Sequence, residues 1–155
     1  MAVEVGAKAP DFTLFDQDRN AVTLSEQLKK GPVVLAFLPG AFSGVCTTEM
    51  CTFRDQASDL NKVNATVLGV STDTFFTLKA WADKEKLSFP LLSDYNREVI
   101  PQYGVNNPDM IGLKNIAKRA VFVIDRSGVV RHREVLDDAR NQPDYGKVTQ
   151  ALSSL

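Results

Sequence analysis

PVVLAFLPGAFSGVCTTE, from Pro32 to Glu49, is the stretch that decides the fold. Residues 33–38 form a continuous apolar run, which is typical of a buried strand. The apolar residues that follow the stretch recur at helical spacing: Met50, Phe53, Ala57 and Leu60. Cys46 therefore lies at a strand–loop–helix junction, where the unpaired N–H groups of a helix N-terminus favour a thiolate. Because the thiolate is the reactive form of cysteine, this position indicates chemistry rather than packing.

The length and composition are typical of one soluble domain spanning residues 1–155. The chain has 155 residues, 44% hydrophobic and 24% charged, which is enough to bury a core without a metal or a disulfide. A net charge of −1 gives no general attraction to nucleic acid or to an anionic membrane. No apolar run reaches the roughly 18 residues of a membrane-spanning helix.

The N-terminus lacks the apolar segment of a signal peptide, so we expect a cytoplasmic protein. In such a reducing compartment its two cysteines, Cys46 and Cys51, are expected to be reactive or buried rather than paired in a structural disulfide.

The order of predicted elements indicates an α/β fold. Residues 12–15 and 21–24 flank a polar turn and predict an N-terminal β-hairpin. Continuous apolar strands are expected at 33–38, 66–71 and 120–125, with a short strand at 91–93 and an antiparallel neighbour at 129–135. Helices are expected from Cys46 to about Asn61, after residue 74, at 98–103 and at 145–155, whereas residues 104–115 are expected to be a loop. This alternation predicts a central sheet covered on both faces, with the 33–38 and 66–71 strands parallel.

The spacing Pro39-x-x-x-Ser43-x-x-Cys46, followed by Arg119 at the start of an apolar strand, resembles the peroxiredoxin pattern. Residues 9–14, 89–94 and 119–128 are also similar to segments of that family, so the likeness covers nearly the whole chain. It is strongest to the alkyl hydroperoxide reductase E-type and bacterioferritin-comigratory-type branches. The resemblance implies a thioredoxin-like fold, with a central mixed sheet flanked by helices, and a thiol peroxidase.

The resemblance also implies roles for individual residues. Cys46 matches the peroxidatic cysteine, and Arg119 matches the arginine that polarises the thiolate and the peroxide. Ser43 matches the hydroxyl residue that bonds both, and Pro39 matches the proline that shields the thiolate. Glu49 falls where an acid or an amide orients the arginine. The chemistry is consistent with these roles, because a positioned guanidinium stabilises the charge that grows on the departing oxygen. No metal, flavin or haem is expected.

The role of Cys51 stays open between a resolving cysteine and a buried, unreactive thiol. In an intact helix, five residues place the two Cα atoms roughly 8.7 Å apart, beyond the ~7 Å limit for a disulfide. A Cys46–Cys51 bridge would therefore require the first helical turns to unwind.

We expect a peroxidase that reduces hydrogen peroxide and organic hydroperoxides through a sulfenic acid on Cys46. The expected reductant is a thiol: thioredoxin, a glutaredoxin-like protein or a low-molecular-weight thiol. A homodimer is compatible with the resemblance. Two alternatives remain, a thiol–disulfide oxidoreductase that uses Cys46 and Cys51, and a redox-switched binding or holdase protein. The oxidoreductase is weaker, because its usual motif is Cys-x-x-Cys and its chemistry does not require Arg119.

Overall fold

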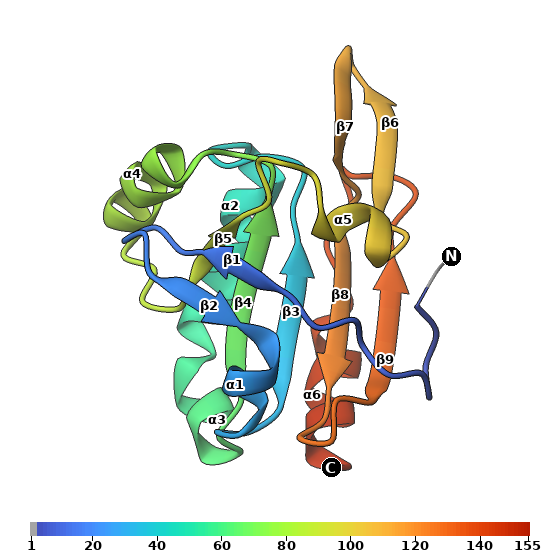
Figure 1. The fold of residues 1–155 in the computed structure, drawn as a ribbon. Helices are drawn as coiled ribbons and strands as arrows, with labels where there is room; N and C mark the ends of the chain where they lie inside the picture. The colour runs from blue at the N-terminus through green and yellow to red at the C-terminus, as the bar shows by residue number, and fades with distance from the viewer. Residues whose placement is uncertain (1–2) are drawn as a thin grey trace.

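A seven-stranded mixed sheet lies at the centre of the computed structural model, which describes residues 3–155 (Figure 1). The strands follow the order β2-β1-β5-β4-β3-β8-β9, and β6 and β7 form a separate two-stranded sheet. The elements along the chain are β1 (Thr13–Phe15), β2 (Ala21–Thr23), α1 (Leu24–Leu28), β3 (Val33–Phe37), α2 (Gly44–Asp55), α3 (Ala57–Lys62), β4 (Thr66–Ser71), α4 (Phe75–Glu85), β5 (Leu91–Ser93), α5 (Val99–Gln102), β6 (Asn106–Met110), β7 (Leu113–Ala117), β8 (Ala120–Ile124), β9 (Val130–Val135) and α6 (Tyr145–Ser153).

Strand β3 lies in the middle of the sheet and determines where the functional loops meet. It pairs in parallel with β4 and antiparallel with β8. In this register Phe37, the last residue of β3, is paired with Ala120, the first residue of β8. Consequently, the loop that leaves β3 and the residue that precedes β8 come together at one edge of the sheet. The predicted parallel pair, the N-terminal hairpin β1–β2 and the antiparallel pair β8–β9 are confirmed.

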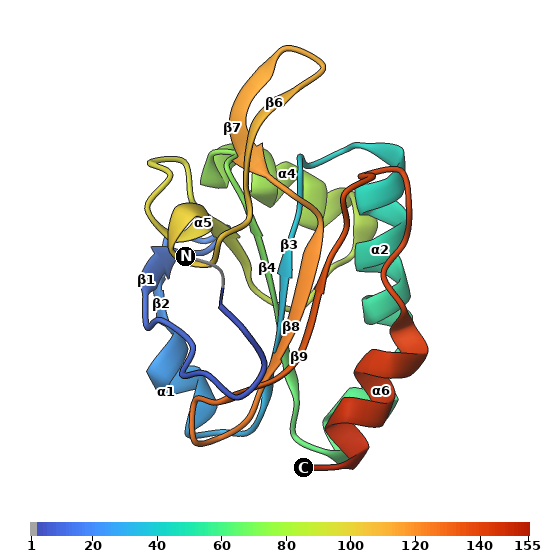
Figure 2. The ribbon, with the colours of Figure 1, turned by 90° about the vertical axis from the view of Figure 1, so that its right-hand side faces the viewer.

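Alternate residues of β3 pack on opposite faces of the sheet, as the period of a strand requires. Val33, Leu35 and Phe37 belong to a core closed by α1 and α5, whereas Val34 and Ala36 belong to a core closed by α2, α4 and α6. Figure 2 shows α2 and α6 on one side of the sheet and α1 and α5 on the other. The expected α/β fold, with a central mixed sheet flanked by helices, is confirmed.

The helices agree with the predicted ones except after α2. The predicted helix to about Asn61 is interrupted at Gln56, so α2 ends at Asp55 and α3 covers Ala57–Lys62. The sequence offers Asp73 and Thr74 as caps for α4, and Thr74 is the one used, since it accepts a hydrogen bond from the N–H of Thr77. Within residues 3–155, no helix combines the length and apolarity needed to cross a bilayer.

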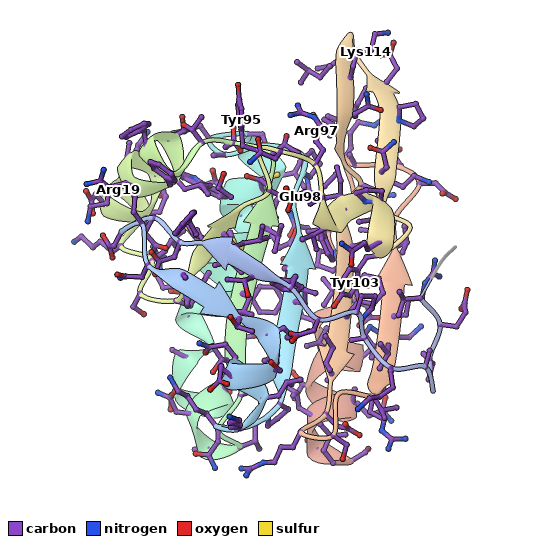
Figure 3. All side chains as sticks on the ribbon, in the orientation of Figure 1. Arg19, Tyr95, Arg97, Glu98, Tyr103 and Lys114 are labelled. Atoms are coloured by element: carbon purple, nitrogen blue, oxygen red, sulfur yellow. The ribbon has the colours of Figure 1, made fainter. Side chains whose placement is uncertain are left out.

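The loop prediction for residues 104–115 is wrong, because β6 and β7 form an antiparallel hairpin there. Its turn places Ile111 and Gly112 at positive φ, 50° and 89°, as a tight two-residue hairpin turn requires. Figures 1 and 2 show this hairpin standing out from the end of the main sheet. Arg97, labelled in Figure 3, holds the middle of β7, since its Nε donates to the Asn115 carbonyl oxygen at 3.0 Å.

Arg131 and Arg133 on either side of His132 predict an exposed histidine, and this prediction is also wrong. Its imidazole on β9 is half-buried, and its Nε2 atom has no hydrogen-bond partner among the described residues. Burial lowers the pKa of His132, so the ring is neutral near pH 7.

A substitution at Gly31, shortly before β3, tests how closely the chain packs there against the backbone of Asn64. A Cβ atom built there would lie 2.1 Å from the backbone oxygen of Asn64, which cannot move without shifting the connection into β4. We expect Gly31→Ala to lower the free energy of unfolding by about 1–3 kcal/mol, measured by urea denaturation.

Gly146→Ala in the first turn of α6 is the matched control. There the nearest atom, Asp144 Oδ1, lies 3.4 Å from the added Cβ, and alanine favours the helix, so we expect unchanged or slightly higher stability. Equal stability of the two variants would contradict the close approach at Gly31.

Candidate active site

Cys46 lies in the first turn of α2, directly after the loop that leaves β3. The helix begins at Gly44, and the Cys46 side chain is fully buried. The N–H groups of this turn have no acceptor within the helix, and their partial positive charge favours an anion at this position. The strand–loop–helix junction predicted for Cys46 is confirmed.

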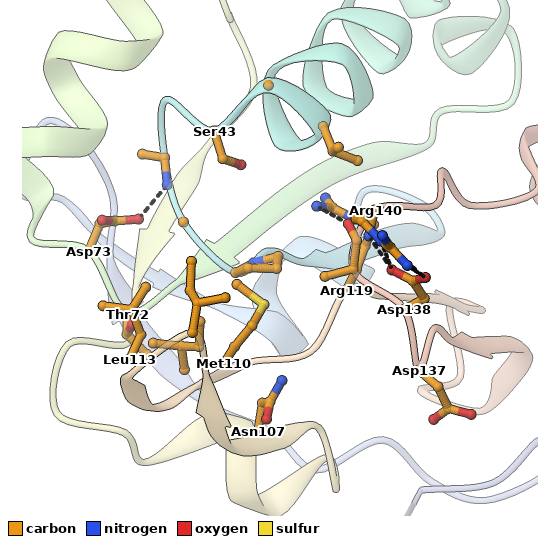
Figure 4. A pocket seen from close by; sticks show the side chains of 18 of the residues that line it. Ser43, Thr72, Asp73, Asn107, Met110, Leu113, Arg119, Asp137, Asp138 and Arg140 are labelled. Carbon is orange, nitrogen blue, oxygen red and sulfur yellow. Dashed lines mark hydrogen bonds and ion pairs between the residues drawn. The ribbon is translucent and has the colours of Figure 1, made fainter.

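Asp73, which follows β4, binds the loop that joins β3 to α2. Its Oδ2 atom accepts hydrogen bonds from the hydroxyl of Ser71 and from the N–H of Ala41, both at 2.7 Å, and Figure 4 shows the bond to Ala41. The next loop residue, Phe42, has a φ of 67°, in the left-handed region that side chains other than glycine rarely adopt. The Asp73 contact therefore fixes the chain just before a sharp turn into α2.

Trp81 on α4 packs against the same turn of α2. Its side chain is fully buried, as expected for a core residue, and Nε1 donates to Thr47 Oγ1 at 3.2 Å. Its ring also lies 6.3 Å from the ring of Phe42, measured between centroids. The first turn of α2 is thus held by contacts from β4 and α4.

Arg119 brings a buried cation to Cys46. The register of β3 and β8 places it beside the end of β3, and its side chain is only 2% exposed. Nη1 lies 3.2 Å from Cys46 Sγ and 2.9 Å from Glu49 Oε1. Nε and Nη2 both donate to the carbonyl oxygen of Ala139, at 3.1 and 2.9 Å, and this fixes the plane of the guanidinium. Burial alone would lower the pKa of Arg119, but Cys46 and Glu49 raise it, so the group stays charged.

Glu49 is a fully buried acid one helical turn after Cys46. Burial raises its pKa to about 7 against the opposing effect of Arg119, and Glu134 adds to the rise. Oε1 accepts from Arg119, whereas Oε2 has no hydrogen-bond partner within residues 3–155. The guanidinium is thus shared between a sulfur and a carboxyl group whose pKa burial raises well above its ordinary value.

Pro39 and Ser43 lie at the wall of a cavity, but neither bonds Cys46. Ser43 is exposed and occupies the N-cap position of α2 without a side-chain capping bond. Over the described part of the chain, no hydrogen bond joins its hydroxyl to Sγ. The expected Ser43–Cys46 bond is therefore missing in this structure, because the side chain faces the cavity instead.

Cys51 lies apart from Cys46 on an unbroken α2. Both cysteines are free, and the half-buried Cys51 thiol faces Glu85 on α4, with 3.9 Å between Sγ and Oε2. Burial raises the pKa of Cys51, opposed by Arg54 and reinforced by Glu85 and Asp55, so the thiol stays protonated at neutral pH. With α2 folded, the structure does not bring the two sulfur-bearing residues together.

A cavity of about 1070 Å³ opens over this site (Figure 4). One wall is the loop from Pro39 to Val45 with Arg119, and the opposite wall is the β6–β7 hairpin. The hairpin contributes four apolar side chains: Met110, Ile111, Leu113 and Ile116. Small molecules can therefore reach the edge of the Cys46 environment from solvent.

The site contains groups that the sequence analysis missed. Asp73 holds the loop before α2, and the Ala139 carbonyl holds Arg119. The β6–β7 hairpin forms one wall of the cavity. An acidic residue two positions after an apolar strand, as Asp73 is, was a usable signal, whereas a backbone carbonyl carries none. Within residues 3–155, no three His, Cys, Asp or Glu side chains cluster in a way that could hold a metal ion.

Comparisons with known proteins agree with this geometry. The family model described as "AhpC/TSA family" matches residues 5–133. Alkyl hydroperoxide reductase E of Mycobacterium tuberculosis is 39% identical over 155 residues, which cover 99% of this chain and 98% of the relative. The chloroplastic 2-cysteine peroxiredoxin of Chattonella marina var. antiqua is 37% identical over 164 residues, 98% of this chain and 82% of the relative.

A solved structure of a related protein resembles this chain over nearly its whole length. The crystal structure of peroxidoxin BcpB from Mycobacterium tuberculosis matches with a TM-score of 0.90 and 33% identity, over 99% of this chain and 98% of that one. The buried cysteine–arginine pair, the mixed sheet and these relatives lead to one assignment: the chain belongs to the AhpC/TSA family and is a peroxiredoxin, a thiol-dependent peroxidase.

Proposed function

We propose that Cys46 is the nucleophile of this peroxidase and that Arg119 stabilises the charge that develops during its attack. The observation that carries this proposal is the 3.2 Å contact between Arg119 Nη1 and Cys46 Sγ beside the cavity. Within residues 3–155, the other cysteine has no cation placed in this way, since the Cys51 sulfur faces the carboxyl group of Glu85.

The proposed step is a displacement at oxygen. The Cys46 thiolate forms a bond to one peroxide oxygen while the O–O bond breaks, and the bond's electron pair leaves with the second oxygen. That oxygen takes up a proton and departs as water or an alcohol, and Cys46 becomes a sulfenic acid. Negative charge moves from sulfur to the departing oxygen, so a fixed guanidinium beside both stabilises the transition state.

The protonation state of Glu49 changes how strongly Arg119 interacts with the sulfur of Cys46. A deprotonated Glu49 draws Nη1 toward a second anion, whereas a protonated Glu49 leaves the charge of Arg119 to the sulfur. We assign Glu49 the role of a positioning residue, supported by its 2.9 Å contact with Nη1 and by its complete burial.

We assign Ser43 and Pro39 roles when the peroxide enters the site, rather than a contact with the sulfur before the peroxide binds. The exposed Ser43 hydroxyl faces the cavity, where it can donate to an incoming peroxide, and Pro39 offers no N–H group to bind water beside the sulfur. These roles are supported by the position of both residues in the cavity wall.

The sulfenic acid is returned to the thiol by a thiol reductant. We propose thioredoxin, a glutaredoxin-like protein or a low-molecular-weight thiol as the donor, and a reducing, cytoplasmic location that supplies it. Cys51 acts as the resolving thiol only if the start of α2 unwinds. A single domain over residues 1–155, acting as a homodimer, completes the proposal.

Substitution of each cysteine separates nucleophile from resolving thiol. We expect Cys46→Ser to abolish peroxide consumption with a thiol donor, and Cys51→Ser to keep the peroxide step. Intact-mass spectrometry after one equivalent of hydrogen peroxide gives the product: loss of two hydrogens indicates a Cys46–Cys51 disulfide, and gain of one oxygen indicates a stable sulfenic acid. Full turnover by Cys46→Ser would refute the assignment.

Replacement of the arginine tests its geometry rather than its charge. We expect Arg119→Lys to lower the second-order rate constant with peroxide on the order of 10²-fold, because lysine lacks the planar fork that Ala139 and Glu49 hold. Stopped-flow kinetics measures this constant. The exposed Arg140 lines the same cavity, so Arg140→Lys is the control and should react as fast as the wild type. Equal losses in both variants would contradict a special role for Arg119.

The Glu49 carboxyl group predicts a pH dependence of stability. Its pKa of about 7 in the folded protein lies above the ordinary value of 4.5, so the folded state binds the extra proton between these values. The contribution of Glu49 to the free energy of unfolding is therefore present at low pH and declines as pH rises toward 7, by on the order of 3 kcal/mol.

Urea unfolding between about pH 5 and about pH 8 should show this decline in the wild type and a smaller one in Glu49→Gln. Glu26→Gln, at an exposed carboxyl group, should follow the wild type. Parallel pH curves for the wild type and Glu49→Gln would show that Glu49 does not titrate in this range.

A further inference from the structure

A segment between β9 and α6, residues 137–142, crosses over the start of α2 and is called here the strap. The carbonyl oxygen of Ala139 in the strap accepts two hydrogen bonds from Arg119. Gln142, three residues on, donates from Nε2 to the carbonyl oxygen of Val45 at 3.1 Å. Its Oε1 atom accepts from the Tyr145 hydroxyl in the first turn of α6, which orients the carboxamide. The strap thus binds both the cation and the helix turn around Cys46.

The bond to Val45 has a specific place in α2. Val45 is the second residue of the helix, so its carbonyl accepts the i→i+4 bond from the N–H of Glu49, in the part of α2 that carries Cys46. Gln142 supplies this carbonyl with a second donor from outside the helix. Unwinding the first turn therefore breaks the Gln142 bond in addition to the helical ones.

The buried position of Cys46 makes such unwinding necessary for part of the catalytic cycle. A small peroxide can approach through the cavity, but the sulfur of a protein thiol or of Cys51 cannot reach a fully buried sulfenic acid. For Cys51 the separation along an intact helix, roughly 8.7 Å between Cα atoms, exceeds the reach of a disulfide. Reduction by either thiol requires the first turn of α2 to open.

Resting on the function proposed above, we propose that Gln142 is a positioning residue that clamps the first turn of α2 and so limits how fast the Cys46 sulfenic acid is reduced. It does not touch the peroxide or the sulfur. The clamped step is Cys46–SOH plus a thiol R–SH giving Cys46–S–S–R and water, in which the S–O bond breaks and an S–S bond forms. A clamped sulfenic acid is instead exposed to a second peroxide, which gives the sulfinic acid and an alcohol or water.

If Gln142 acts as a clamp, its loss changes the rate of sulfenic acid reduction but not the rate of sulfenic acid formation. If Gln142 only supported the fold, its loss would change both rates together. Loss of one net hydrogen bond shifts the opening equilibrium by about fivefold, which corresponds to about 1 kcal/mol. Because the folded turn remains the dominant state, the rate of sulfenic acid formation stays within about twofold of the wild type. The rate of reduction by a bulky thiol rises by about fivefold.

The experiment uses the full chain with Cys51→Ser as background, so that Cys46 is the sole thiol. Gln142→Met removes the bond at similar side-chain volume, and Gln142→Glu keeps the acceptor for Tyr145 but cannot donate to Val45. Asn141→Ala, at the exposed neighbouring residue of the strap, is the matched control. Stopped-flow measures sulfenic acid formation with one equivalent of hydrogen peroxide, and then its capture by thionitrobenzoate as the thiol probe.

We expect both Gln142 variants to capture thionitrobenzoate about fivefold faster than Asn141→Ala, with equal rates of sulfenic acid formation. They should also yield less sulfinic acid when excess peroxide and the probe compete. Equal capture rates, or a peroxide step slowed as much as capture is changed, would overturn the clamp.

Hydrogen exchange on the reduced protein tests the clamp without any peroxide chemistry. Amides of residues 44–50 should exchange faster in Gln142→Met than in Asn141→Ala, while those of β3 and β8 should not change. Unchanged exchange in residues 44–50 would overturn the inference even with an active peroxidase. Absence of a sulfenic acid in every variant, with faster exchange in Gln142→Met, would instead refute the proposed function and keep the clamp.

Discussion

The sharing of one buried guanidinium between a sulfur and a carboxyl group is the constraint on which the site depends. An arginine that is 2% exposed needs partners for its charge and its N–H groups, because an unpaired buried charge costs several kcal/mol. Arg119 has Cys46, Glu49 and the Ala139 carbonyl. Two of these partners belong to α2 and the third to the strap, while Arg119 itself stands at the sheet edge, so all three segments must be in place before the charge is satisfied.

The sequence predicts the scaffold of this site because its signals are local and strong. An apolar run between prolines predicts β3, helical spacing predicts α2, and the strand starting at Ala120 carries Arg119 at its beginning. The parallel pairing of residues 33–38 with 66–71 then follows from the handedness of the crossover, whereas the meeting of Cys46 and Arg119 was expected only from the family resemblance. The burial of Glu49 beside them was expected only from the resemblance, since a lone acid after Cys46 is otherwise typical of a solvated helix face.

The features that were not predicted depend on contacts between distant segments. The β6–β7 hairpin was expected to be a loop because Asn106, Asn107 and Pro108 are turn-forming residues, and its turn uses a positive φ at Ile111, which no sequence rule favours at a β-branched residue. The strap acts partly through a backbone carbonyl, which has no residue signature. Ser43 shows a different failure: the motif predicts a bond from its hydroxyl to Cys46, but the exposed side chain lines the cavity and makes no such bond within residues 3–155.

The single tryptophan of the chain gives the start of α2 an intrinsic optical reporter. Trp81 is fully buried, bonded through its indole N–H to Thr47, and in ring contact with Phe42 on the loop before the helix. Opening of that turn would break the indole hydrogen bond and admit water to the ring, so emission intensity and wavelength would both change. Opening of the first turn of α2 is therefore linked to a fluorescence signal that needs no label.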